Sequence, residues 1–302
     1  MPILHSIQQT ISLLQNGQLI AVPTETVYGL AAPIDSPISV RQIFAQKGRP
    51  VDHPLIIHVS SLEMAEQYGY FSATAKQIAK HFWPGPLTII VPKKDTVIAE
   101  VTGNLDTVAI RMPNHPMMLD IIKTLNIPLA APSANKFGKI SPTMAQHVID
   151  DFADTVSVLD GGECAIGIES TILDMSEELP CIRRFGQITE IDLLPFIQTF
   201  GQTETKTSGT HKAHYAPSTS LLLSDDIESD RILYQDLGLS VAILAPQNNE
   251  DYAKTLYAEL RRLDTLGVDI LIAAKPILEG IGLAVLDRLS RASAGSNQHR
   301  FS

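Results

Sequence analysis

Apolar positions along the first 200 residues follow two patterns, one helical and one extended. Ile7, Ile11 and Leu14 lie three or four residues apart, and Gly17 follows them, so a helix that ends near the glycine is predicted. By similar patterns, with Ser72 as one N-cap, helices are expected at 6–16, 38–46, 72–82, 116–125, 143–152 and 190–200. Short apolar runs predict strands at 19–23, 54–59, 86–91, 107–112, 127–132, 156–159, 171–175 and 181–185.

The chain after residue 200 changes character twice. Residues 201–218 are almost all polar, rich in Gly, Thr and Ser, and predict a linker or lid. Beyond it, strands expected at 219–223, 241–245 and 268–274 alternate with helices expected at 252–263 and 282–292. The prediction is an α/β protein with a first domain at 1–200, a linker at 201–218 and a small Rossmann-like domain at 219–302.

Composition narrows the class of protein. The 302 residues are 44% hydrophobic and 19% charged, as expected of a globular protein with a substantial core. With 33 acidic and 23 basic residues the formal charge is −10, which disfavours non-specific binding to nucleic acid. Neither a secretion signal nor 18 consecutive apolar residues is present, so a cytoplasmic protein without a membrane span is predicted. Cys164 and Cys181 form no CxxC pair, and two reduced thiols are expected rather than a zinc site.

Two polar motifs follow predicted elements in the first third of the chain. The run PTETVYGL, residues 23–30, crowds hydroxyls, a carboxylate and a phenol where a strand ends, a usual ligand position in α/β proteins. A polar turn is an equally good interpretation of that run. Lys47 and Arg49 flank Gly48 and could both point at one polyanion, although a solvated basic loop is the commoner meaning of such a pair.

Further candidates lie at the ends of later strands. Arg111 closes a predicted buried strand and therefore needs an acidic partner or a ligand carboxylate. The runs PSAN at 132–135 and GIEST at 167–171 suit either a ligand or a turn, and His58 alone suits a core position. No GxxxxGK[ST], GxGxxG or Ser-His-Asp signature occurs, so any use of ATP does not involve a P-loop.

Taken in order, these motifs resemble one family. PTETVYGL, KGRP with PLIIHV, WPGPLT, TVAIRMP, PSAN and RRFG are similar to the YrdC-like threonylcarbamoyl-adenylate synthases over most of residues 10–200. HYAP at 214–217 and GLAVLDRL at 282–289 resemble the longer, two-domain branch of that family. The resemblance implies a twisted α/β domain with a large, concave, positively lined cavity, followed by a small Rossmann-like domain.

The resemblance also implies roles for individual residues. Lys47 and Arg49 would be catalytic by holding the triphosphate, and Mg²⁺ would be bound mainly through ATP phosphates rather than by protein ligands. The ATP site would comprise Lys47, Arg49, His53, Thr107, Ser133, Asn135, Ser141, Arg184 and Tyr215. The threonine site would comprise Thr26, His58, Arg111, Ala131, Ser170 and Thr171. The chain departs from the family pattern at two places. His53 stands where the family often has Asn, which leaves a nucleotide contact by this residue undecided, and residues 208–211 differ from the family's linker, which leaves the way the lid closes undecided.

The implied activity is that of a nucleotidyltransferase. L-threonine, bicarbonate and ATP would give threonylcarbamoyl-AMP and pyrophosphate, and a downstream transferase would use the product to modify a tRNA adenosine, with tRNA contacted only indirectly. Two alternatives are a double-stranded RNA-binding module of the same fold and a carbamoyl-transfer relative with another acceptor. The charge of −10 disfavours the first, and the absence of acylphosphatase and zinc-finger segments disfavours the second.

Overall fold

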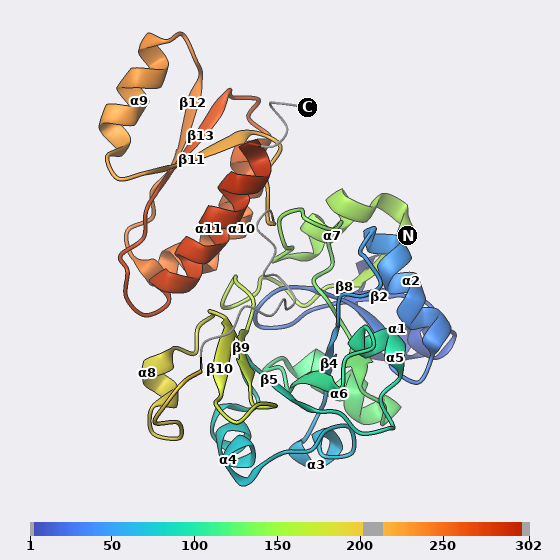
Figure 1. Ribbon diagram of the computed structural model, residues 1–302. Helices are drawn as coiled ribbons and strands as arrows, with labels where there is room; N and C mark the ends of the chain where they lie inside the picture. The colour runs from blue at the N-terminus through green and yellow to red at the C-terminus, as the bar shows by residue number, and fades with distance from the viewer. Residues whose placement is uncertain (1–2, 202–213, 298–302) are drawn as a thin grey trace.

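The computed structural model describes residues 3–201 and 214–297, which form two sheets with their covering helices (Figure 1). The larger sheet has the strand order β1-β8-β2-β3-β7-β4-β6-β5-β9-β10 and mixes parallel with antiparallel neighbours. Its strands are β1 (Ile3–Leu4), β2 (Ile20–Val22), β3 (Gly29–Pro33), β4 (Ile56–His58), β5 (Leu87–Pro92), β6 (Thr107–Arg111), β7 (Leu129–Ala130), β8 (Ser157–Leu159), β9 (Thr171–Asp174) and β10 (Cys181–Arg184).

Helices of the first domain cover this sheet, and several begin where a serine caps them. Ser72 accepts a hydrogen bond from the Ala75 N–H at 3.1 Å, as predicted for an N-cap. The helices are α1 (Ile7–Gln15), α2 (Pro37–Lys47), α3 (Leu62–Ala65), α4 (Ala73–Phe82), α5 (Ala99–Thr102), α6 (Pro116–Leu125), α7 (Ala145–Phe152), the 3₁₀ turn Ala153–Thr155, and α8 (Glu190–Leu193). The mixed α/β architecture predicted for the first domain is confirmed.

The C-terminal part is a separate three-stranded parallel sheet in the order β11-β13-β12. Its elements are β11 (Ser220–Ser224), α9 (Ile227–Asp236), β12 (Val241–Leu244), α10 (Asn249–Asp264), β13 (Ile270–Ala274) and α11 (Gly282–Asn297). Helix α9 lies on the outer face of the sheet, whereas α10 and α11 lie between the sheet and the first domain (Figure 1). Two helices of the small unit therefore form its contact with the large one.

Two backbone features place the candidate residues together. Strands β4 and β6 run parallel with His58 opposite Arg111, so these side chains share the carboxyl edge of the sheet. Helix α2 ends at Gly48, whose φ of 66° is the left-handed conformation that glycine adopts without strain. That turn separates Lys47, the last helical residue, from Arg49.

Some predicted elements differ in the structure. The helix expected over 190–200 is wrong, because α8 ends at Leu193 and Pro195 has no N–H with which to continue it. Strand β3 and helix α9 were not predicted, and the strand expected at 127–132 is reduced to β7. Most of the expected linker, residues 202–213, lies outside the described residues, but residues 214–217 are buried rather than solvated.

No helix within the described ranges is both long and apolar enough to cross a bilayer.

Candidate active site

One buried pocket collects residues from distant parts of the chain at the carboxyl edge of β4 and β6. The free space between its walls is only ≈ 50 Å³. Nine of the fifteen residues expected in the ligand site line it: Thr26, Arg49, His58, Arg111, Ala131, Ser133, Ser170, Arg184 and Tyr215. The rest of its wall is formed by Thr24, Val27, Gly29, Ile56, Pro132, Glu169 and His214.

Arg111 lies on one wall, where neighbouring protein groups hold its guanidinium in place. Its Nη1 donates to Thr26 Oγ1 at 2.9 Å and its Nε to the Gly85 carbonyl at 3.2 Å. Its Nη2 lies 2.6 Å from Glu25 Oε2 in an ion pair of two nearly buried side chains. The acidic partner that burial demands is therefore Glu25, and the fork still faces the pocket.

The threonines of the PTETVYGL run shape the loop beside Arg111. Thr24 Oγ1 accepts from the N–H groups of Thr26 and Val27, at 3.1 and 3.2 Å, and donates to the Val27 carbonyl at 2.6 Å. This side-chain turn follows β2 and directs the Thr26 hydroxyl toward Arg111. Gly29 then lets the chain approach the next strand, since a Cβ there would lie 3.0 Å from that of Ala131.

His58 faces Arg111 across the parallel strands and is almost completely buried. Burial, together with the nearby Arg111 charge, lowers the pKa of its imidazole to about 3. Its Nδ1 has no hydrogen-bond partner among the described residues. A neutral imidazole with an unpaired nitrogen at a pocket wall is suited to a polar ligand group.

Lys47 does not line the pocket but supports its wall from behind. Its buried ammonium donates to the carbonyl of Ser133 and, at 2.6 Å, to that of Asn135. Burial, and next the charge of Arg49, hold the pKa of Lys47 well below its ordinary value. In this state Lys47 fixes the PSAN turn, while Arg49 lines the pocket itself.

Asn135 presents one unpaired oxygen beside this turn. Its Nδ2 donates to the carbonyls of Lys136 and Lys139 at 2.7 and 2.9 Å, whereas its buried Oδ1 has no partner among the described residues. No group of three or more His, Cys, Asp or Glu side chains in the described part of the chain could hold a metal. The unpaired Asn135 oxygen could add to the oxygen ligands of a Mg²⁺ ion that nucleotide phosphates carry.

Glu169 is a pocket residue that sequence reasoning missed, although it belongs to the quoted GIEST run. Its Oε1 accepts from the Ser141 hydroxyl at 2.7 Å, so Ser141 reaches the pocket only through it. Burial raises the pKa of Glu169, but the charges of Arg288 and then Arg184 bring it to about 2. Arg184 also donates to the Ser170 carbonyl at 3.0 Å and to its hydroxyl at 3.1 Å. Glu169 and the arginines are therefore ionised together.

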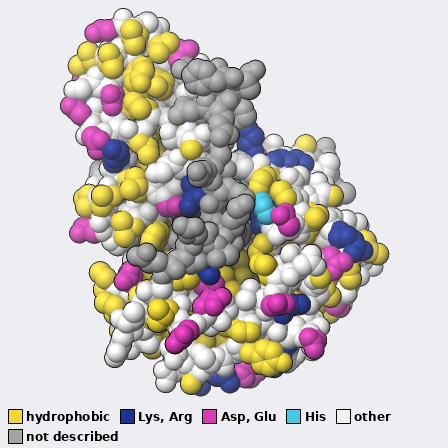
Figure 2. Space-filling model, in the orientation of Figure 1, with side chains coloured by type: hydrophobic (Ala, Val, Ile, Leu, Met, Phe, Trp, Pro, Cys, Tyr) yellow, Lys and Arg dark blue, Asp and Glu magenta, His cyan; other side chains and the backbone are white. Residues whose placement is uncertain are grey.

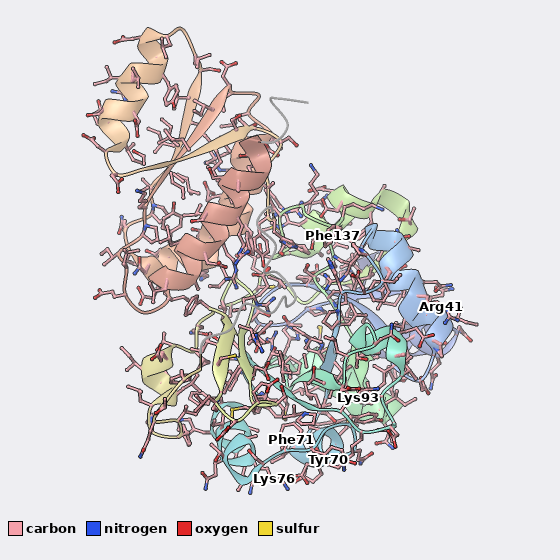
Figure 3. The ribbon with its side chains drawn as sticks, viewed as in Figure 1. Arg41, Tyr70, Phe71, Lys76, Lys93 and Phe137 are labelled. Carbon is pink, nitrogen blue, oxygen red and sulfur yellow. The ribbon has the colours of Figure 1, made fainter. Side chains whose placement is uncertain are left out.

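The HYAP run closes the pocket from the side of the second domain. Tyr215 is 1% exposed and His214 6% exposed, and their rings meet at 4.1 Å. Phe137 lies 5.9 Å from the His214 ring and 6.0 Å from the Arg49 guanidinium. Phe137 is located in the upper part of the first domain, on the side nearer the second (Figure 3). The sequence marked Tyr215 through its motif, whereas His214 carried no role.

Besides Lys47, Asn135 and Ser141, three more of the expected residues lie outside the pocket wall. Thr107 pairs with Pro92 at the start of β6, four residues and thus about 13 Å from Arg111, so the structure does not bring it to the pocket. The Thr171 hydroxyl donates to the Ile188 carbonyl at 2.6 Å. Of Ser170 and Thr171, only Ser170 lines the pocket. The ring centroid of His53 lies 5.5 Å from that of Phe137, and His53 is not part of the pocket wall.

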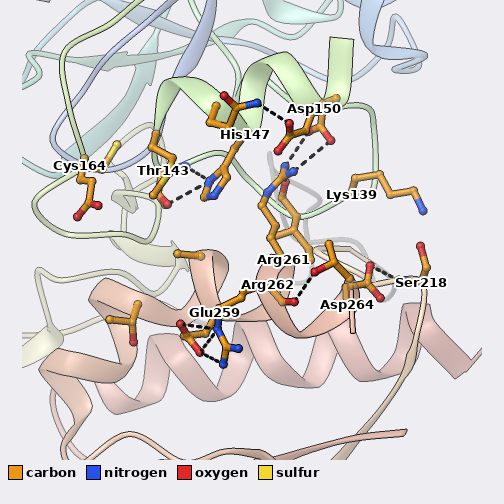
Figure 4. Close-up of a pocket in the computed structure, with 18 of the residues that line it drawn as sticks. Lys139, Thr143, His147, Asp150, Cys164, Ser218, Glu259, Arg261, Arg262 and Asp264 are labelled. Atoms are coloured by element: carbon orange, nitrogen blue, oxygen red, sulfur yellow. Dashed lines mark hydrogen bonds and ion pairs between the residues drawn. The ribbon is translucent and has the colours of Figure 1, made fainter. Parts of the chain in front are cut away.

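A larger cavity of ≈ 860 Å³ lies between α7 and α10 (Figure 4). Its arginines are neutralised, Arg261 by Asp151 at 2.7 Å and Arg262 by Glu259 at 2.7 Å. Its one buried histidine, His147, accepts from the Thr143 N–H at 3.2 Å, and the pocket-facing groups are divided evenly in charge. Size alone would favour this cavity, but the convergent, partly unpaired polar groups belong to the smaller pocket.

Comparisons with known proteins agree over nearly the whole chain. The family described as "Telomere recombination" (Sua5_yciO_yrdC) matches residues 12–186, and "Threonylcarbamoyl-AMP synthase, C-terminal domain" matches residues 181–294. The threonylcarbamoyl-AMP synthases of Pyrococcus abyssi and Bacillus subtilis are each 38% identical, covering 93% and 96% of this chain and 92% and 93% of their own. The crystal structure of P. abyssi Sua5 complexed with L-threonine superposes with a TM-score of 0.91 at 36% identity, covering 96% of this chain and 94% of that one.

Proposed function

This chain belongs to the Sua5/YrdC family of threonylcarbamoyl-AMP synthases, and from that premise we propose that it condenses L-threonine, bicarbonate and ATP into threonylcarbamoyl-AMP and pyrophosphate. The observation that carries the proposal is the single buried pocket in which Arg111, His58 and Thr26 face Arg49, Ser133 and Arg184. One group suits an amino acid, and the other suits a phosphate chain.

The threonine half would bind its ligand through opposite charge and neutral polar groups. Arg111 is positioned to clamp the threonine carboxylate, because Glu25 and Thr26 fix its fork. His58, neutral and with a free Nδ1, is suited to the hydroxyl or amine. Ser170 and Ala131 complete this side, and the small alanine leaves room for a side chain.

The reaction would proceed in two steps. The threonine amine adds to CO₂ with loss of a proton, or to bicarbonate with loss of water, and gives a carbamate. A carbamate oxygen then attacks the α-phosphorus of ATP, and the bond to the β-phosphate oxygen breaks to release pyrophosphate. Negative charge is spread over the phosphates, so Arg49 and Arg184 would stabilise it while Lys47 holds the PSAN turn. Mg²⁺, when bound with ATP, would neutralise further phosphate charge.

Catalysis in this scheme depends on position and charge rather than on a general base. Glu169 and Glu25, the acidic groups at the pocket, are both held in ion pairs, with Arg288 and Arg111. Proximity and a preorganised electrostatic environment supply large rate factors without proton transfer. We therefore assign no side chain as the base.

The pocket in this state is closed. Ligand pockets typically hold 300–1,000 Å³, roughly ten times the ≈ 50 Å³ left here, so ATP requires His214 and Tyr215 to move outward. Their return over the bound nucleotide would exclude water from the mixed anhydride that forms.

The wider setting follows from the same premise. We place the reaction in the cytoplasm, with the product passed to a transferase that modifies tRNA, and with no direct tRNA contact. On the face shown in Figure 2, Lys and Arg of the described residues are scattered among Asp and Glu. A net charge of −10 and such a face do not favour the RNA-binding alternative.

The test is threonine-dependent release of pyrophosphate. Purified protein with α-labelled ATP, Mg²⁺ and bicarbonate is assayed with and without L-threonine. The expected result is an adenylate product and pyrophosphate only when threonine is present, lost in Arg111→Ala. Arg41→Ala is the matched control, because Arg41 is exposed on α2 and pairs with Glu100 far from the pocket (Figure 3). Absence of threonine-dependent turnover in folded protein that binds ATP would overturn the proposal.

A further inference from the structure

Two side chains of the C-terminal unit reach into the first domain and meet the carboxylate of Glu169. Arg288 on α11 donates from Nε to Glu169 Oε2 at 3.0 Å, and Tyr257 on α10 donates its hydroxyl to the same oxygen at 2.8 Å. The other oxygen, Oε1, is taken by Ser141. Glu169 lines the pocket, so this is a contact between the second domain and the candidate active site.

Arg288 is completely buried in this position. Its Nη1 donates to Asp287 at 2.9 Å, while its Nη2 has no partner among the described residues. Removing an arginine and a carboxylate from water is costly, and apolar residues of similar volume commonly give equal or greater stability. Stability alone is therefore a weak reason for this pair.

The same two side chains hold Tyr215. Its ring stacks on the Tyr257 ring at 5.4 Å and 27°, and the Arg288 guanidinium lies 5.7 Å from its centroid. The backbone is tied on both sides, since His214 N–H donates to the Arg291 carbonyl and Ala216 N–H to that of Gly138. Tyr215 itself has a φ of 61°, a left-handed conformation that a tyrosine keeps only when its surroundings fix it.

The backbones of the two domains are also in direct contact at this place. Gly167 has a φ of 86°, and a Cβ there would lie 2.3 Å from the Lys254 carbonyl oxygen and 2.6 Å from that of Ala253, both on α10. Only glycine permits this approach. The loop that carries Glu169 is thus seated against the helix that carries Tyr257.

We propose that Arg288 and Tyr257 are positioning residues for the nucleotide half of the pocket: from the second domain they hold Glu169 and Tyr215, and through these they set Ser141 and Arg184. This inference rests on the proposed synthase function. It assigns the C-terminal domain a part in building the ATP site. The competing explanation is that the two side chains only hold the domains together.

A pair of tyrosine variants on one helix separates these explanations. Tyr257→Phe removes the hydroxyl that reaches Glu169 and keeps the ring that stacks on Tyr215. Tyr252→Phe removes another hydroxyl of α10, which donates to the Ala274 carbonyl at 2.8 Å within the C-terminal unit, from a side chain that is also buried. Both variants lose one hydrogen bond, Tyr257 one to a charged carboxylate and Tyr252 one to a neutral carbonyl, so the stability of each variant is measured beside its ATP constants.

The readout is steady-state kinetics and binding of ATP with Mg²⁺ to the full-length protein. For Tyr257→Phe we expect about a five- to tenfold rise in KM and Kd for ATP, the effect of one lost hydrogen bond, with KM for threonine within about twofold. For Tyr252→Phe we expect both constants within about twofold of the unsubstituted protein. Equal ATP constants for the two variants would overturn the proposal and leave only the structural role.

A pH profile gives a second, independent readout at Arg288. Glu169 faces Arg288, Arg184, Tyr257 and Tyr215 from four different segments, and its pKa of about 2 depends on the first two. Arg288→Met removes the charge that lowers the pKa of Glu169 most, so the pKa of this buried carboxyl rises. We expect kcat/KM for ATP to fall below about pH 6 in Arg288→Met and to recover above neutrality, with Arg288→Lys intermediate.

The outcomes distinguish failure of this inference from failure of the proposed function. If the unsubstituted protein shows no threonine-dependent turnover, the synthase proposal fails first. If it turns over and Arg288→Met has a pH profile parallel to the unsubstituted protein, the positioning role fails alone. Should Arg288→Met not fold, the tyrosine pair still decides, because each member loses only a hydroxyl.

Discussion

The neutral state of His58 predicts a measurable acid sensitivity of the first domain. The imidazole has a pKa near 6.5 in the unfolded chain and about 3 in the folded protein. Between these values the unfolded state binds one more proton, so stability falls as pH falls. The full shift corresponds to about 5 kcal/mol, of which about 2 kcal/mol is lost between pH 8 and pH 5.

His58→Gln removes this proton uptake and keeps a polar side chain in the pocket wall. Trp83 is the only tryptophan of the chain and is buried in the first domain, so urea unfolding followed by its fluorescence reports on the domain that holds His58. The difference in unfolding free energy between the two proteins should change by about 2 kcal/mol from pH 8 to pH 5. Other titrating groups are common to both proteins and cancel in this difference.

The predicted acid sensitivity is refuted if that difference stays constant within about 0.5 kcal/mol from pH 8 to pH 5. His5→Gln, a change at an exposed histidine, shows whether replacing any histidine alters the slope. Nuclear magnetic resonance of the His58 ring carbon provides a direct check, because its chemical shift should remain that of a neutral imidazole at pH 5.

Three further variants test other parts of the site. Lys47→Met leaves the Ser133 and Asn135 carbonyls without their donor, and urea unfolding should show a loss of about 3 kcal/mol together with reduced turnover; a loss under about 0.5 kcal/mol would contradict the supporting role. Arg111→Lys should raise KM for threonine at least about tenfold while leaving that for ATP within about twofold; the opposite selectivity would exclude the carboxylate clamp. Thr107→Val should leave kcat/KM within about twofold, and a tenfold loss would show that this residue reaches the pocket after all.

The sequence predicted the elements whose apolar spacing is strong and missed those defined by tertiary pairing. Strand β3 reads GLAAP, and Gly, Ala and Pro have low strand propensity, so its pairing with β2 and β7 determines its conformation. Helix α9 has no buried residue, and its apolar positions therefore lack the one-sided pattern that marks a core helix. The helix predicted at 190–200 was wrong because Pro195 lacks the N–H that would continue the helical hydrogen bonds.

Some site residues could likewise be recognised from the sequence, whereas another could not. Arg111 could be recognised because a charge at the end of a buried strand is unusual, and the motifs identified Thr26, His58 and Tyr215. Glu169 could not be recognised from the sequence, because its hydrogen-bond partners Tyr257 and Arg288 lie 88 and 119 residues away. Both stand on helices whose placement no local pattern determines. Spatial convergence of distant residues, rather than any single motif, made the carboxylate a pocket residue.

Gly167 allows the two domains of this protein to approach each other to one short, fixed distance. Since even a methyl group there would collide with two carbonyl oxygens of α10, the gap between the domains is set by the absence of one side chain. A larger residue at position 167 would require α10 to move, and a shift of α10 would require the loop around Gly167 to move with it. A chimera that joins a foreign C-terminal domain to this catalytic domain would therefore need a matching close approach at residue 167 before the same contact with α10 could form.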